Sequence, residues 1–325
     1  MVWSVLLGLL LAAGVPAGAA GATLEVSQPT YATSNSDYDR NPSIIFDGSD
    51  YWLFWTKGDG GGVRGQGSPP YDPDGDTYVV YYKKATTIAG LASAAETKLA
   101  LSETSRPANF TQRVVSATYF DGKVYAFVSS GQDGTDRGLY YYEYSGGSWS
   151  GPITLIADAT ARGGHVNVTS DGSRVYLVWE ATADASSDCY TWDGTTLSAK
   201  VDVSSDNEPK ITRMGGTLYV VGIEDGTGDL EVHSAAAAAS PSFSSHSTAS
   251  AGAGYSDPCI FSDGTDLYVV TASYDSGNDR QYLVQARYSG GSWAAAKKVS
   301  HGGYAGAYWW EYWPCGYYDG SDLWL

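Results

Sequence analysis

The sequence predicts an all-β protein and, within that class, a six-bladed β-propeller. Its 325 residues include 26 tyrosines, 11 tryptophans and 40 glycines, a composition that favours strands joined by tight turns over helices. A short phrase built around Asp-Gly recurs along most of the chain. The interval between copies is close to the length of a propeller blade, roughly 40–50 residues.

The repeat has six alignable copies. They are NPSIIFDGSDYWLFW (41–55), VSATYFDGKVYAFVS (115–129), HVNVTSDGSRVYLVW (165–179), EPKITRMGGTLYVVG (208–222), DPCIFSDGTDLYVVT (257–271) and WPCGYYDGSDL (313–323). Their turn anchors, Asp47, Asp121, Asp171, Met214, Asp263 and Asp319, lie 74, 50, 43, 49 and 56 residues apart. Each copy has the pattern of a β-hairpin, because a turn, Asp-Gly in five copies and Met-Gly-Gly in the fourth, joins two apolar, β-rich runs.

Further strands follow most of the hairpins. Residues 139–156, 189–203 and 281–299 each contain a Gly-rich or Asp-Gly turn between two more β-rich runs. Four antiparallel strands per copy make a propeller blade. The only helix-prone run, 235–239, is too short for the helices of a TIM barrel or a doubly wound fold. The sixth copy has room for only two strands before Leu325, so we expect an incomplete last blade in a truncated chain, with residues 23–29 as a possible outer strand.

The N-terminus predicts export. An apolar run from Val5 to Ala13 is followed by small residues suited to signal cleavage, so we interpret 1–22 as a signal peptide and 23–325 as the propeller domain. The protein is then secreted or held at the cell surface, without a later membrane span. In an oxidising compartment Cys259 and Cys315, which share one repeat position, could form a disulfide; the alternative is two buried thiols.

The charge and the remaining motifs narrow the partners. A net charge of −17 disfavours nucleic acid and anionic lipid. The run GGGVRG at 60–65 fits GxGxxG, but no helix pattern follows to hold a pyrophosphate, so no nucleotide cofactor is expected. Asp72, Asp74 and Asp76 alternate as calcium ligands often do, although acidic turn residues are the commoner explanation.

Polar residues occupy one register of the repeat. Counting back six residues from each anchor gives Asn41, Val115, His165, Glu208, Asp257 and Trp313, with Arg40, Arg113 and Glu311 close by in the sequence. Innermost propeller strands run along the central axis, so we expect these residues at one mouth of the channel, with Glu180 nearby. An excursion of the chain at 58–77 is a candidate lid at the same mouth.

The stretch YDRNPSIIFDGSDYWLFWT (38–56) resembles two families of carbohydrate-active propellers. Arg40-Asn41-Pro42 resembles the start of the six-bladed sialidases, which implies that Arg40 belongs to a carboxylate-binding arginine cluster. The five-bladed arabinanase and xylosidase type opens with Asp-Pro-x-Ile, in which the Asp is the general base. In this sequence Asn41-Pro42-Ser43-Ile44 has an amide at that position, while Asp257-Pro258-Cys259-Ile260 keeps the Asp in the fifth copy.

The leading hypothesis is therefore a secreted glycoside hydrolase that acts on a glycan or polysaccharide. Glu208 and Asp257 would form its pair of carboxyl groups, with Glu180 as the reserve. Arg40, Asn41, Arg113, His165, Glu311 and Trp313 would bind substrate. The alternative is a non-catalytic propeller module that binds glycan or protein at the cell surface.

Overall fold

A computed structural model describes residues 8–9, 30–31, 39–58, 78–99, 112–130, 138–157, 164–180, 187–204, 206–250, 254–275, 280–299 and 314–325. Nearly all of the regular structure in these ranges is β-strand, and a 3-10 helix, η1 (Ala89–Ala92), lies after β5. No described helix is long and apolar enough to cross a membrane. The predicted signal peptide (1–22) lies outside the described residues, except for the short strand β1 (Gly8–Leu9). The calcium candidates Asp72, Asp74 and Asp76 also lie outside them.

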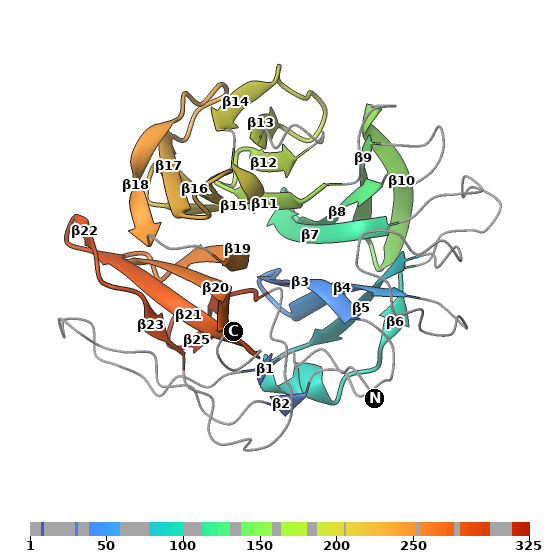
Figure 1. The fold of residues 1–325 in the computed structure, drawn as a ribbon. Coiled ribbons are helices and arrows are strands. Elements are labelled where there is room, and N and C mark those ends of the chain that lie inside the picture. The colour runs from blue at the N-terminus through green and yellow to red at the C-terminus, as the bar shows by residue number, and fades with distance from the viewer. Residues whose placement is uncertain are drawn as a thin grey trace.

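Five sheets of four or five strands form a ring in which the first strand of each sheet is innermost (Figure 1). The first contains β3 (Asp39–Phe46), β4 (Tyr51–Gly58), β5 (Tyr78–Ala85) and β6 (Thr97–Lys98), and the second contains β7 (Gln112–Phe120), β8 (Lys123–Ser130), β9 (Gly138–Ser145) and β10 (Ser148–Ala157). The third contains β11 (Val166–Ser170), β12 (Val175–Glu180), β13 (Ser187–Trp192) and β14 (Val201–Ser204). The fourth contains β15 (Asn207–Met214), β16 (Thr217–Ile223), β17 (Leu230–Ala236) and β18 (Ser244–Ser250). The fifth contains β19 (Tyr255–Ser262), β20 (Leu267–Asp275), β21 (Arg280–Ser289), β22 (Ser292–Trp293) and β23 (Lys297–Lys298).

The sixth copy of the repeat forms a hairpin of two short strands, β24 (Tyr317–Tyr318) and β25 (Leu323–Trp324). The hairpin contacts both the fifth and the first sheet: Leu323 packs in a cluster with Phe261, and Trp324 is buried with Leu53. A further short pair joins β1 to β2 (Thr30–Tyr31). The predicted all-β propeller is confirmed. Its five complete blades match the five-bladed alternative rather than six full blades, and the sixth copy supplies only its two predicted strands.

An aspartate and an aromatic side chain stabilise most of the repeat turns. The Asp171 carboxylate accepts hydrogen bonds from the amides of Ser173 and Arg174, at 2.8 and 2.9 Å, and from the Tyr176 hydroxyl, at 2.7 Å. The same arrangement links Asp47 to Trp52, Asp263 to Tyr268 and Asp319 to Trp324. At Asp121 the turn is different: Asp121 and Gly122 both have positive φ, and Phe120 pairs directly with Lys123. The aspartate of the repeat is thus chiefly a structural residue.

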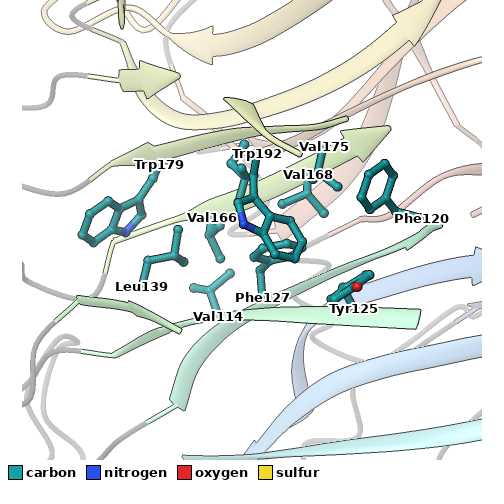
Figure 2. Packing of buried hydrophobic residues seen from close by; sticks show 11 residues of the cluster. Val114, Phe120, Tyr125, Phe127, Leu139, Val166, Val168, Val175, Trp179 and Trp192 are labelled. Atoms are coloured by element: carbon teal, nitrogen blue, oxygen red, sulfur yellow. The ribbon is translucent and has the colours of Figure 1, made fainter. Parts of the chain in front are cut away.

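Aromatic and aliphatic side chains fill the spaces between neighbouring blades. Figure 2 shows Trp192 of the third blade over Tyr125 and Phe127 of the second. The Trp192 ring meets both edge-on, with centroids 5.0 and 5.7 Å away. Such pairs add about 0.5–1.5 kcal/mol beyond the burial of their area. This packing fixes the angle between blades and so the positions of the inner strands.

Polar side chains on the inner strands also tie the first four blades together. The Ser43 hydroxyl accepts the Ala117 amide N–H at 3.0 Å, the Ser116 hydroxyl accepts that of Val168 at 3.1 Å, and the Asn167 amide oxygen accepts that of Ile211 at 2.8 Å. These contacts satisfy inner-strand donors that have no neighbouring strand on the channel side. Asn167 is also the first residue of the glycosylation sequon Asn167-Val168-Thr169, and its side chain is engaged in these hydrogen bonds inside the ring.

Candidate functional site

Three inner strands begin with the same unusual backbone. Asn41, Glu208 and Asp257 have φ of 51°, 55° and 51°, and each precedes a proline. The strand pairing shifts at these points, between Arg40 and Ser43, Asn207 and Lys210, and Ser256 and Cys259. Such bulges change the direction in which a side chain points. A non-glycine residue in the left-handed region is strained, and strained residues cluster at functional sites. Three of the six positions in the repeat register therefore have this strained backbone.

Carboxylates from three successive blades are connected at this end of the ring. Glu180, at the end of β12, accepts the Glu208 backbone N–H on Oε2 at 3.1 Å. Glu208 in turn accepts the Asp257 backbone N–H on Oε2 at 2.5 Å. The backbone of Glu180 is held in place because its N–H donates to the His165 carbonyl at 3.0 Å. Glu180, Glu208 and Asp257 are thus linked from blade to blade by carboxylate-to-backbone hydrogen bonds, and the His165 carbonyl lies beside Glu180.

Burial makes these carboxyl groups harder to ionise. It raises the pKa of Asp257 to about 7, with a further contribution from the Glu208 carboxylate, while Lys210 and Arg40 act in the opposite direction. Burial also raises the pKa of Glu208 and of Glu180, and the neighbouring Glu208 charge adds to the effect on Glu180. A carboxyl group that holds its proton near neutral pH can serve as a general acid.

A central cavity of about 290 Å³ runs between the inner strands of all five complete blades and the segment before β24. Asn41, Lys210 and Asp257 line it, together with the sulfur-bearing residues Cys259 and Cys315. Glu180 and Glu208 are not among the lining residues, so Asp257 is the carboxyl group of the three that faces the cavity. The site therefore combines a buried acid that lines the cavity with two carboxylates that accept backbone N–H groups of the next blade.

Lys210 lies at this site, although the sequence analysis did not single it out. It follows Glu208 by two residues on β15 and lines the cavity. Burial lowers the pKa of its amine, while the charges of Glu208 and Asp257 oppose that effect. The available signal was its register, four residues before the anchor, where the other copies have Ser43, Ala117, Asn167 and two cysteines.

The remaining predicted residues fall into two groups. Arg40 lies close enough to Asp257 to favour its ionised form, and Asn41 lines the same cavity. The Arg113 side chain and the whole of Glu311 and Trp313 lie outside the described residues, as does the calcium candidate Asp72, Asp74 and Asp76.

Cys259 and Cys315 are free thiols, the second of the two alternatives for that pair. Burial raises the pKa of the Cys259 thiol, and repulsion between its thiolate and that of Cys315 raises it further.

Comparisons with known proteins bear on the fold. No protein-family model matches the sequence, and no curated protein matches it. Among solved structures, an α-L-arabinofuranosidase from Lactobacillus brevis is similar with a TM-score of 0.52 and 14% identity, covering 84% of this chain and 96% of that one. An exo-β-1,3-galactanase from Clostridium thermocellum has a TM-score of 0.50 and 13% identity, covering 78% of this chain and 60% of that one.

A third similar structure is the catalytic domain of an α-L-arabinofuranosidase from Coprinopsis cinerea, with a TM-score of 0.48, 12% identity and coverage of 73% of this chain and 84% of that one. At these identities the likeness establishes the fold alone. The chain thus shares its β-propeller fold with an arabinofuranosidase and a galactanase.

Proposed function

We propose that the protein is a secreted glycoside hydrolase that binds a polysaccharide at one end of the propeller and cleaves a glycosidic bond with Asp257 and Glu208. The observation that carries this proposal is the setting of Asp257: it faces the central cavity, its pKa is raised to about 7 by burial and by Glu208, and its backbone is strained. The similarity of the fold to an arabinofuranosidase and a galactanase supports the substrate class.

The two carboxyl groups have different tasks in this mechanism. Protonated Asp257 donates its proton to the oxygen of the leaving sugar as the glycosidic bond breaks. Glu208, ionised while Asp257 is protonated, stabilises the positive charge that develops on the sugar ring. It then either activates a water molecule or attacks the anomeric carbon, depending on its separation from Asp257. Glu180 is the reserve for this second task.

Substrate recognition belongs to the same proposal. Arg40, Asn41 and His165 would bind sugar hydroxyls, joined by Arg113 and Glu311, while Trp313 would stack on a sugar face. Calcium at Asp72, Asp74 and Asp76 would serve to order the neighbouring segment; the proposed reaction uses no other cofactor. Secretion or attachment to the cell surface follows from residues 1–22.

A screen of chromogenic arabinofuranosides, xylosides, galactosides and sialosides tests the activity. On any substrate that is cleaved, Asp257→Asn and Glu208→Gln should each lower kcat by at least about 100-fold, because proton transfer by a positioned side chain contributes 10²–10⁴-fold. Asp225→Asn, at an exposed turn, is the matched control and should keep the parental rate. Parental rates in both site variants would remove this pair from the mechanism.

A binding module is the second candidate, and one observation favours it. The carboxylates of Glu180 and Glu208 each accept a backbone N–H of the next blade, a use that the fold itself can require. The site would then hold a glycan or protein ligand without cleaving it. A glycan array followed by product analysis distinguishes the two candidates. If a glycan binds to the parental protein and is recovered intact after long incubation with it, the module is favoured.

A further inference from the structure

Lys210 occupies a position at which the fold does not require a charge. The equivalent residues of the first three copies are Ser43, Ala117 and Asn167, and those of the last two copies are cysteines. All of these positions lie on the inner ring and line the cavity. A propeller blade can therefore place a small or neutral side chain there, and the long cationic side chain of the fourth blade needs another explanation.

We propose that Lys210 is a positioning residue for the carboxyl pair. Its ammonium favours the ionised form of Asp257 and so determines how readily the Asp257 carboxyl group gives up its proton. This inference deepens the proposed function, because it assigns to one cation the control of the acid at the same site.

The charged and titratable groups that interact with Lys210 come from several elements. Its own strand β15 supplies Glu208, the end of β12 supplies Glu180, and β19 supplies Asp257 and Cys259. Cys315 faces it from the segment before β24. Arg40 of β3 acts on Asp257 from the other side and is the second cation of the cluster.

Lys210 acts on this cluster through space. Among the described residues it makes no ion pair within 4.0 Å, while its charge interacts with Glu180, Glu208 and Asp257 together. A direct pair with Asp257 would lock that carboxyl group in its ionised form. A cation without such a direct pair, in surroundings that screen charges poorly, lowers the proton affinity of Asp257 without abolishing it.

The direction of the effect follows from the charges. Removing the ammonium removes a favourable interaction with the Asp257 carboxylate, so the protonated form persists to higher pH. An opposite charge within about 4–6 Å typically lowers the pKa of a carboxyl group by 1–3 units. We therefore expect the Asp257 titration to move upward by at least about one unit when Lys210 loses its charge.

Carboxyl ¹³C NMR of aspartate-labelled protein tests this without any substrate. The Asp257 signal is assigned by its loss in Asp257→Asn and followed from pH 4 to 9 in the parent, in Lys210→Met and in Lys210→Arg. The expected result is an upward shift of the titration midpoint by about one unit or more in Lys210→Met, with a return to within about half a unit of the parent in Lys210→Arg. A midpoint that is unchanged in a folded Lys210→Met overturns the inference.

Two further measurements make the result decisive. If Lys210→Met fails to fold, Lys210→Gln gives the same neutralisation with a polar end group, and an unchanged midpoint there also overturns the proposal. On a cleaved substrate, the alkaline limb of the kcat profile should move upward by the same amount as the NMR midpoint. Absence of hydrolysis together with a shifted NMR midpoint would overturn the proposed function alone, whereas hydrolysis with an unshifted midpoint would overturn only the role of Lys210.

Discussion

Asp171 shows how a repeat anchor contributes to stability. Burial opposes the ionisation of its carboxyl group, but hydrogen bonds from Ser173, Tyr176 and the Arg174 amide outweigh this and hold its pKa at about 2. Because the folded-state pKa lies below that of the unfolded chain, the stabilisation is complete above about pH 4 and disappears as the pH falls toward 2.

Asp171→Asn should therefore lower the free energy of unfolding at pH 7 by about 1 kcal/mol, which is below the usual value of about 1.5–3 kcal/mol for hydrogen bonds to a charged group because the site is only partly buried. The difference from the parent should shrink between pH 4 and pH 2. Urea unfolding at pH 7, 4 and 2 measures this, with exposed Asp225→Asn as the control. An equal difference at all three pH values would contradict the assignment.

At the residue scale, sequence reasoning located Glu208 and Asp257 because the anchors define a register and both residues share it. It did not single out Lys210, because Glu180, Asp257 and Cys315, with which Lys210 interacts, come from other parts of the ring. No local pattern around Lys210 reveals such neighbours. The register of the anchors predicts where a side chain enters the ring, but it does not predict which charges it meets there.

Strands and turns could be predicted for similar reasons of period and composition. The hairpins β3–β4, β11–β12 and β19–β20 follow the Asp-containing repeats, and the predicted third and fourth strands at 139–156 became β9 and β10. The bulges at Asn41, Glu208 and Asp257 were not predicted, because residues before proline ordinarily prefer an extended backbone. The three positive φ angles depend on the tertiary contacts of the inner ring.

The bulge of β3 gives a test at the scale of one element. Asn41 has φ of 51°, a conformation that asparagine tolerates and that is unfavourable for a β-branched residue. Asn41→Val should destabilise the protein by about 1–2 kcal/mol, whereas Asn41→Gly should fall within about 0.5 kcal/mol of the parent. Thr169→Val, in a regular part of β11, is the control for adding a valine on the inner ring. Chemical denaturation checks the order, and equal losses in both Asn41 variants would contradict it.

Blade-to-blade hydrogen bonds operate at the scale of the whole molecule. Asn167 accepts the Ile211 N–H of the fourth blade and donates to Ser116 of the second at 3.2 Å. Asn167→Val should cost about 1–3 kcal/mol, because it leaves a buried N–H without an acceptor, and Asn167→Asp should recover part of the loss by restoring one. Unfolding experiments together with hydrogen exchange of the Ile211 amide measure the effect. Faster exchange in the valine variant alone is expected, and unchanged exchange would show that the bond is dispensable.

The number of complete blades was the least predictable feature of the whole molecule. Six copies of the hairpin are visible in the sequence, yet a complete blade also needs third and fourth strands, which vary in length and have weaker signals. The fifth sheet illustrates this, since β22 and β23 are two short pieces that pair with different parts of β21. Counting anchors therefore predicts the order of the hairpins around the ring, while the number of complete sheets depends on segments without a repeated phrase.

Asp257 couples the proposed chemistry to the stability of the whole ring. Its pKa is raised to about 7 in the folded protein, whereas an aspartate of the unfolded chain titrates near 3.9. Between these values the folded state keeps a proton that the unfolded state has lost, so stability falls as the pH rises from about 4 to 7, and above 7 the full cost of the buried charge is present.

Asp257→Asn removes this ionisation while it keeps the shape of the side chain. At pH 8 the variant should be more stable than the parent by up to a few kcal/mol, since one pKa unit corresponds to about 1.4 kcal/mol, and the two should converge near pH 4. Thermal and urea unfolding from pH 4 to 8 measure the difference, with Asp225→Asn as the control for a change of one in net charge. A gain in stability accompanied by a loss of kcat is the behaviour expected of a buried acid retained for function. A variant no more stable than the parent at pH 8 would mean that Asp257 is ionised at little cost, and it would then be unsuited to act as the general acid.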